Sequence, residues 1–162
     1  FKTGALSRLA AELGAAAAGA TESQTEAIGD LWEEIGVGFQ ILDDVRNLVK
    51  GNPGKLRGDD IVEGKKSLPV LIHGERSADL GASLLALFER VAEAHAAKTP
   101  VQPLIEQAIA MMEASGALSA ASREGEALLD GARNRLKSAW PAGEARAGME
   151  DLIETFWEGL KP

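Results

Sequence analysis

Apolar side chains at intervals of three and four constrain the fold of this chain more than any other feature. Between residues 28 and 42 they recur at Ile28, Leu31, Trp32, Ile35, Phe39 and Leu42. This period places them on one side of an α-helix as an apolar stripe. Similar stripes follow along the chain, and no run alternates polar and apolar residues as a half-buried strand does. We therefore predict an all-α fold whose core is formed by these stripes.

Glycine, proline and capping residues predict where the helices begin and end. A Thr-Glu-Ser cap opens the long acidic helix, and Gly-Asn-Pro-Gly at residues 51–54 breaks the chain after it. A helix is expected at Leu68 with Pro69 in its first turn, ending at His73. The predicted helices cover residues 2–20, 21–50, 68–73, 78–97, 103–115, 117–140 and 144–160.

Composition excludes several classes of protein. The chain has 162 residues, no cysteine and a net charge of -8. This length fits one domain, and the lack of cysteine excludes a disulfide framework and indicates a reducing compartment. No apolar run of about 20 residues is present, so we expect a cytoplasmic protein with no membrane span. The negative charge argues against nucleic acid, because that binding depends on lysine and arginine neutralising phosphates.

Polar chemistry is concentrated on one face of the second helix. Gln40, Asp43, Asp44 and Asn47 stand three or four residues apart, so their side chains share that face. Adjacent carboxylates repel each other unless a cation lies between them. Carboxylate oxygens suit Mg²⁺, which usually shares its ligand shell with substrate phosphates. Gly29 and Gly36 fall on the same side and are interpreted as leaving room for a ligand.

The segment after this helix carries the opposite charge. Basic side chains that we expect to face phosphate groups are Lys50, Lys55, Arg57, Lys65 and Lys66. The glycines here lack the GxxxxGK(S/T) spacing and the preceding strand of a nucleotide P-loop, so that interpretation is rejected. An acidic, metal-binding face opposite a group of lysines predicts a site for a metal diphosphate.

In order and spacing, these residues resemble the second aspartate-rich region of the trans-isoprenyl diphosphate synthases, FQxxDDxxD followed by a glycine/lysine loop and D…GKx(T/S). The matching positions are Phe39, Gln40, Asp43, Asp44, Lys55, Asp60, Gly64, Lys65 and Ser67. Asn47 replaces the last aspartate, which is similar to the geranylgeranyl diphosphate synthase branch. The resemblance implies an isoprenoid synthase-type helical bundle. Residues 1–162 would form the C-terminal half of its single domain, because the first aspartate-rich motif, DDxxD, is not found.

The resemblance also implies a reaction, the Mg²⁺-dependent condensation of isopentenyl diphosphate with an allylic diphosphate. The implied catalytic residues are Asp43, Asp44 and Lys65. The implied metal ligands are Asp43, Asp44, Asn47 and Asp60. The implied diphosphate contacts are Lys2, Thr3, Phe39, Gln40, Lys55 and Lys65. Terpene cyclases share the fold, but they lack the lysine-rich GKxS loop and fit less well.

Three interpretations of the missing motif stay open at this point. The chain is part of a longer synthase, or a small subunit completed by a partner chain carrying the first motif, or a non-catalytic helical subunit that regulates a full-length synthase. Apolar stripes without partners also predict association, with a second copy or with such a chain. Among single residues, Thr3 is either a diphosphate contact or a helix N-cap. His73 and His95 are read as ordinary helix residues.

Overall fold

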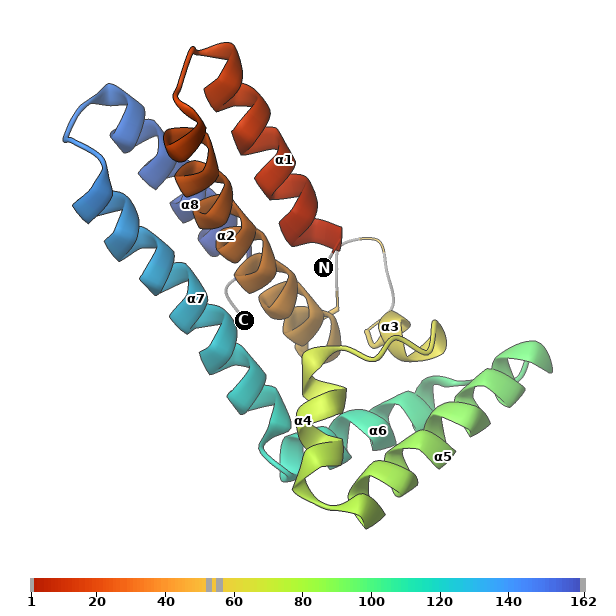
Figure 1. The fold of residues 1–162 in the computed structure, drawn as a ribbon. Helices are drawn as coiled ribbons and strands as arrows, with labels where there is room; N and C mark the ends of the chain where they lie inside the picture. Colours follow the sequence, from red (N-terminus) through yellow and green to blue (C-terminus); the bar gives the residue numbers. More distant parts are fainter. Residues whose placement is uncertain (1, 52–53, 55–56, 161–162) are drawn as a thin grey trace. The chain divides into compact units, whose positions relative to one another are not determined.

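The computed structural model describes residues 2–51, 54 and 57–160. Within them the regular elements are α-helices, with no strand (Figure 1). The helices are α1 (Lys2–Ala17), α2 (Glu22–Val49), α3 (Asp59–Val62), α4 (Leu68–Arg76), α5 (Ala78–Ala96), α6 (Gln102–Ala114), α7 (Ala117–Ala139) and α8 (Glu144–Leu160). The predicted all-α fold is confirmed, and α3 is an additional short helix that the sequence pattern did not indicate. None of the helices described is both long and apolar enough to cross a membrane.

The chain divides into two compact units. Of the described residues, 2–42 and 124–160 form the first unit, and 43–123 form the second. The boundary falls inside α2 and again inside α7. Each unit has its own apolar core, so each is described separately.

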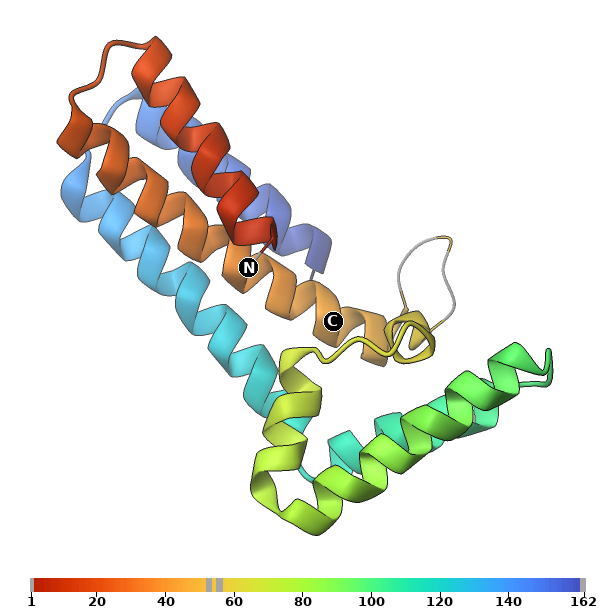
Figure 2. The same cartoon turned by 45° about the vertical axis from the view of Figure 1, so that its right-hand side comes forward.

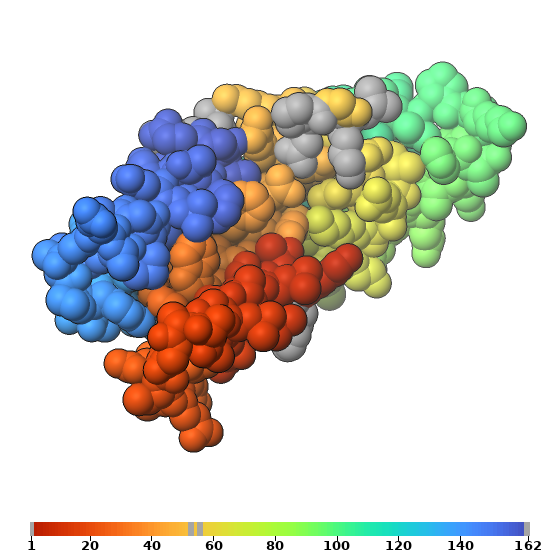
Figure 3. All heavy atoms as spheres, turned by 90° about the horizontal axis from the view of Figure 1, so that it is seen from above, coloured from red at the N-terminus to blue at the C-terminus, as the bar shows by residue number. Residues whose placement is uncertain are grey.

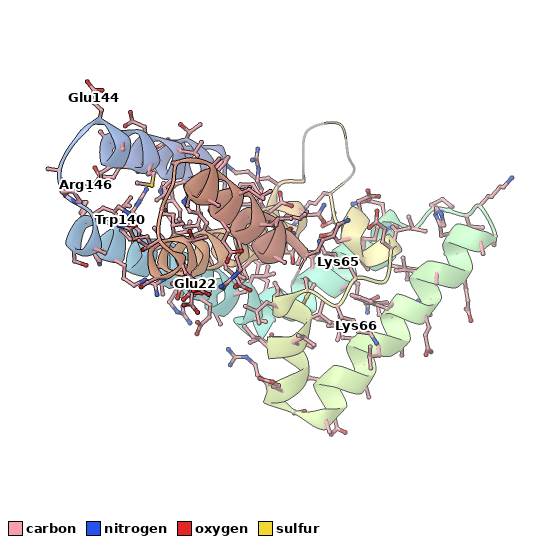
Figure 4. All side chains as sticks on the ribbon, turned by 45° about the horizontal axis from the view of Figure 1, so that its top comes forward. Glu22, Lys65, Lys66, Trp140, Glu144 and Arg146 are labelled. Atoms are coloured by element: carbon pink, nitrogen blue, oxygen red, sulfur yellow. The ribbon has the colours of Figure 1, made fainter. Side chains whose placement is uncertain are left out.

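The first unit is built from α1, α2 up to Leu42, the later part of α7, and α8, which lie side by side (Figures 1 and 2). Its buried core residues are Leu31, Ile35, Leu42, Leu129, Ala132, Leu136, Ile153 and Leu160. Ile28, Trp32 and Phe39 pack against this cluster, so the apolar stripe predicted on α2 is confirmed. Arg146 of α8 donates hydrogen bonds to the carbonyl oxygens of Lys137, in the last turn of α7, and of Trp140, just after α7, at 3.4 and 3.2 Å (Figure 4).

Glycines allow the helices of the first unit to approach closely. A Cβ atom added at Gly36 would lie 2.9 Å from the Cα atom of Gly4 and 2.6 Å from the Ser7 hydroxyl. One added at Gly38 would lie 3.0 Å from the carbonyl oxygen of Gly125. A Cβ atom at Gly29 would overlap the Glu12 side chain. The interpretation as space for a ligand is therefore wrong at Gly29, where the Glu12 side chain of α1 already fills that space. Gly36 allows the close approach of α1 and also lines an apolar cavity, so at this position the interpretation stays a prediction.

The leucine stripe of α1 lies on the outside of the first unit. Leu6, Leu9 and Leu13 are 58%, 52% and 62% exposed, whereas Gly4 is buried. Figure 3 shows α1 as an outer face of this unit. These leucines have helical spacing, but in the described structure they do not belong to a core. The reason is that α1 contacts α2 through its opposite face, where Gly4 and Ser7 permit close packing.

The second unit contains the end of α2, α3 to α6, and the start of α7. Its buried core residues are Leu48, Ile61, Val70, Leu84, Leu87, Phe88, Val91, Ile105, Ala108, Ile109, Met112, Ala117 and Leu118. The helices α4 and α5 approach at two glycines, where a Cβ atom on Gly81 would lie 3.2 Å from the Cα atom of Gly74.

His73 does not end its helix, as the sequence suggested. Helix α4 continues to Arg76, and His73 lies inside it with no exposed surface. Its Nδ1 atom is 2.8 Å from the hydroxyl of Ser115. His73 is therefore a core residue of the second unit. His95 lies exposed on α5, as expected.

Candidate functional site

Three charged residues of the predicted motif meet in the second unit. The Lys65 ammonium lies 2.6 Å from Oδ1 of Asp44 and 3.1 Å from Oδ2 of Asp60. Asp44 comes from the last two turns of α2, Asp60 from α3, and Lys65 from the segment between α3 and α4, where Figure 4 labels it. The fold thus brings together carboxylates and a lysine that are separated by up to 21 residues in the sequence.

Burial and the neighbouring charges together determine the protonation of Lys65 and the net charge of this cluster. Asp44 is 6% exposed, and the Lys65 side chain is about one-third exposed. Partial burial lowers the pKa of Lys65, but hydrogen bonds and charges from Asp44 and then Asp60 outweigh it, so the pKa of Lys65 is raised. Lys65 is therefore an ammonium at neutral pH. Two carboxylates face this one ammonium, so the cluster keeps a negative charge that favours a further cation.

Asn47 organises the backbone beside this cluster. It is 1% exposed, and its Oδ1 atom accepts a long hydrogen bond of 3.4 Å from the backbone N–H of Asp60. Its own carbonyl oxygen accepts a hydrogen bond from the N–H of Gly58, at 3.0 Å. Its Nδ2 atom is buried and has no hydrogen-bond partner among the described residues. These contacts position Asp60, and a role of Asn47 as a metal ligand stays a prediction.

The basic residues of the segment differ in their surroundings. Arg57, expected to face phosphates, instead contacts protein groups, the Leu48 carbonyl oxygen and the Glu106 carboxylate. Lys50 and Lys66 are exposed. Lys55, predicted to contact diphosphate, lies outside the described residues.

The predicted residues of the first unit form a separate group. The Thr3 hydroxyl donates a hydrogen bond of 2.6 Å to Oε1 of Gln40. Thr3 lies inside the first turn of α1, which begins at Lys2, so it is not the N-cap. Lys2 is exposed. The ring of Phe39 packs edge-to-face against Phe156, with centroids 5.5 Å apart, and so contributes to the apolar core.

An apolar cavity adjoins Thr3, and its lining includes Gly36, which the sequence analysis interpreted as leaving room for a ligand. Its volume is about 170 Å³. It is lined by Thr3, Ser7, Trp32, Ile35, Gly36, Phe39 and Phe156. An apolar protein cavity of about 150 Å³ is large enough to bind benzene. The cavity therefore suits a small hydrocarbon group. Its lining comes from α1, α2 and α8, so residues more than 100 apart in the sequence contribute to it, and the sequence did not indicate that Phe156 of α8 belongs to it.

The carboxylates can be tested against the chemistry of Mg²⁺. Among the described residues, no three Asp, Glu, His or Cys side chains are grouped so that they alone could hold a metal ion. Mg²⁺ does not require such a cage, since proteins usually bind it through one or two carboxylates together with substrate phosphates. Asp44 and Asp60, which already converge on a cation, fit this second mode. The donor set is thus suited to a metal diphosphate and not to a metal ion bound by protein alone.

Comparison with known proteins places these residues in a recognised family. Residues 1–105 match the model of the family described as Polyprenyl synthetase. The chain is 29% identical over 160 residues to geranylfarnesyl diphosphate synthase of Natronomonas pharaonis, an alignment that covers 98% of this chain and 43% of that protein.

Solved structures give the same result for the fold. A geranylgeranyl pyrophosphate synthase superposes with a TM-score of 0.80 and 27% identity, over 96% of this chain and 47% of the other. A decaprenyl diphosphate synthase from Rhodobacter capsulatus superposes with a TM-score of 0.78 and 29% identity, over 99% and 48%. The chain therefore spans less than half the length of each of these three proteins.

Proposed function

Because the chain belongs to the polyprenyl synthetase family, we propose that it takes part in isoprenoid chain elongation, the condensation of isopentenyl diphosphate with an allylic diphosphate. One observation carries the proposal. The motif residues Asp44, Asp60 and Lys65 converge within 2.6 to 3.1 Å, in an arrangement that suits a metal-bound diphosphate.

The proposed reaction needs charge stabilisation and positioning more than a nucleophile. The C–O bond of the allylic diphosphate breaks, and its electron pair leaves with diphosphate. The alkene of isopentenyl diphosphate forms a C–C bond to the allylic carbon, and the departed diphosphate then takes up the proton that the product cation loses. Negative charge develops on the leaving diphosphate, so groups fixed around it in advance lower the barrier.

We assign these tasks to residues of the second unit. Asp43 and Asp44, with Asp60, are the proposed carboxylates of the metal diphosphate. Bound Mg²⁺ would neutralise charge on the departing diphosphate. Lys65 is the proposed donor to diphosphate oxygens, since its raised pKa keeps it protonated. Asn47 holds Asp60 in place, and Lys55 is a second proposed diphosphate contact.

In the first unit we propose that Lys2, Thr3 and Gln40 contact the polar part of a prenyl diphosphate. Phe39 was also predicted as a diphosphate contact. We now propose that it lines the apolar cavity, which takes hydrocarbon. Support comes from the Thr3–Gln40 hydrogen bond and from the volume of that cavity.

Binding of inorganic pyrophosphate and of geranyl diphosphate, with and without Mg²⁺, tests the proposal. We expect Mg²⁺-dependent binding to the wild-type chain that is lost in Asp43→Ala and in Lys65→Met, while Lys98→Met, at an exposed position just after α5, keeps it. If the wild-type chain binds neither compound in the presence of Mg²⁺, the proposal is wrong.

Turnover is a separate question, because the chain spans less than half of its relatives. We propose that catalysis needs further carboxylates, on the same polypeptide or on a partner chain carrying the first aspartate-rich motif. Elongation activity would then appear on mixing with such a chain.

The alternative is a non-catalytic subunit that associates with a full-length synthase, and the exposed leucines of α1 favour some association. In that case a complex with the synthase would form on mixing, and Asp43→Ala in this chain would leave the activity of that complex unchanged.

A further inference from the structure

The cluster of Asp44, Asp60 and Lys65 combines two fixed carboxylates with a cation on a long side chain. Asp44 lies in α2 and is 6% exposed, so its carboxylate has little freedom to turn. The backbone N–H of Asp60 donates to Oδ1 of the buried Asn47, which holds Asp60 near the end of α2. Lys65 differs from both, because a flexible four-carbon stem carries its ammonium and about one-third of its side chain is exposed.

Only the side chain of Lys65 has to move for the ammonium to leave the cluster. The backbone N–H of Lys65 donates a hydrogen bond of 2.9 Å to the carbonyl oxygen of Asp60, which fixes the main chain at this point. Rotamer changes of a partly exposed side chain are fast compared with movements of the backbone. The two carboxylates would therefore stay in place while the ammonium turned toward solvent or toward a ligand.

The ammonium occupies the position that a metal ion bound to both carboxylates would need. Its Nζ atom lies 2.6 Å from Oδ1 of Asp44 and 3.1 Å from Oδ2 of Asp60, so one small cation already contacts both oxygens. A metal ion bound to the same two oxygens would meet the ammonium at close range and be repelled by its charge. The two cations therefore exclude each other.

We propose that Lys65 is an exchangeable counter-ion, which fills the metal position of Asp44 and Asp60 until a diphosphate offers its ammonium other oxygens. This inference rests on the proposed function and adds to it a coupling between metal and diphosphate. Metal alone has to displace the ammonium and therefore binds weakly. A diphosphate draws the ammonium away and brings its own oxygens, so each ligand strengthens the binding of the other.

A purely structural ion pair makes a different prediction. If Lys65 only holds the fold together, its removal disturbs Asp44 and Asp60 and weakens the binding of metal and of diphosphate alike. If its ammonium competes with metal, its removal leaves two carboxylates without their cation, so metal alone binds more tightly while diphosphate loses a donor. Opposite signs of the two effects therefore identify the exchange.

The experiment measures the binding of Mn²⁺ alone, by electron paramagnetic resonance of the free ion, with Mg²⁺ as competitor. Mn²⁺ suits carboxylate and water ligands, as Mg²⁺ does. Lys65→Met is expected to bind metal alone at least about tenfold more tightly than the wild type, because it removes a positive charge at contact distance. Adding Asp44→Asn to Lys65→Met should abolish this gain. Lys65→Arg keeps a cation and should bind metal no more tightly than the wild type.

Lys98→Met is the matched control, because it removes the same charge from an exposed position just after α5 and should leave metal affinity unchanged. The same variants are then titrated with pyrophosphate in the presence of Mg²⁺ by calorimetry. Lys65→Met should bind pyrophosphate more weakly than the wild type, although it binds metal alone more tightly.

The outcomes separate this inference from the proposed function. Equal or weaker metal binding by Lys65→Met, or a gain that survives Asp44→Asn, overturns the inference, whatever the wild type does with pyrophosphate. Absence of Mg²⁺-dependent pyrophosphate binding by the wild type overturns the proposed function, and the metal titration still decides the exchange. If Lys65→Met does not fold, Lys65→Gln replaces it, because its amide can donate to Asp44 without carrying a charge, and unchanged metal affinity there also overturns the inference.

Discussion

The Nζ atom of Lys65 lies 2.6 Å from Oδ1 of Asp44, although 21 residues separate them in the chain. Asp44 is almost fully buried, and a buried carboxylate is strongly destabilising unless a partner compensates its charge. Asp60 approaches the same ammonium at 3.1 Å. The ion pair therefore holds α3 and the segment before α4 against the end of α2, independently of any ligand.

This contact predicts a pH dependence of stability. The pKa of Lys65 is raised in the folded state above its ordinary value of 10.5. A group with a raised folded pKa contributes stability that is complete below the unfolded pKa and is lost as the pH rises through the folded pKa. The destabilisation caused by Lys65→Met should be constant up to pH of about 9 and shrink above about 10.5. Urea denaturation across this range measures it.

Partial exposure of Lys65 limits the size of this effect, because solvent and salt screen the pair. Lys66→Met is the control, since it removes the same charge from an exposed neighbour. A Lys65→Met effect that stays constant to the highest pH, or that grows, would show that the pair does not stabilise the fold.

Most helices were predictable because the residues that define them, caps, turn glycines and apolar stripes, lie within or next to each helix in the sequence. The cap at Thr21 accepts a hydrogen bond from the Gln24 backbone, and the Gln24 side chain accepts one from the Thr21 N–H, so that α2 begins where a capping box predicts. The break after α2 follows from Gly51, whose φ is +81°. The stripe from Ile28 to Leu42 forms part of the core of the first unit or packs against it, as its period predicts.

Features that depend on distant partners were not predictable. Nothing near Arg57 in the sequence points to Glu106, and nothing near His73 points to Ser115. The leucines of α1 have the same spacing as a core stripe, yet α1 packs against α2 through its opposite face, which carries Gly4. The motif indicated which side chains gather at Lys65, but not that Asn47 would be buried beneath them.

Gly58 provides a test of the packing between the residue just before α3 and Ile105 of α6. Gly58→Ala introduces a left-handed alanine, which costs about 1–2 kcal/mol, and an overlap with Ile105, which costs about a further 1–3 kcal/mol. Gly54→Ala is the matched control, because Gly54 has a φ of +80° but open space around its Cβ position. Equal losses of unfolding free energy in the two variants would contradict the packing argument.

Gly36 tests the close approach of α1 and α2. Gly36→Ala should destabilise the chain by about 1–3 kcal/mol, because the new Cβ atom meets the backbone of Gly4. Gly131→Ala on α7 has open space at its Cβ position and should instead stabilise by about 0.5–1 kcal/mol, through helix propensity. Thermal unfolding of both variants checks the difference in sign. Stabilisation by Gly36→Ala would show that α1 and α2 do not pack this closely at Gly36.

The buried histidine predicts a cost for losing its partner. Ser115→Ala leaves Nδ1 of His73 without its hydrogen bond, and an unsatisfied buried polar group costs about 1–3 kcal/mol. Ser119→Ala, at an exposed position of α7, is the control and should change the unfolding free energy by less than about 0.5 kcal/mol. Similar small effects of both substitutions would mean that water replaces the serine hydroxyl.

The exposed leucines of α1 predict that the chain associates. Leu6, Leu9 and Leu13 lie on one face at more than half exposure, and contiguous apolar surface of this kind marks interaction sites. The double variant Leu6→Glu/Leu13→Glu should fold normally, since neither side chain is in the core, but should weaken association at least about tenfold, because two carboxylates would have to be buried. Sedimentation velocity over a range of concentrations measures this.

Leu71→Glu, at a similarly exposed leucine of the second unit, is the control and should leave association unchanged. A wild-type chain that stays monomeric, alone and when mixed with a chain carrying the first aspartate-rich motif, would show that this face has no protein partner.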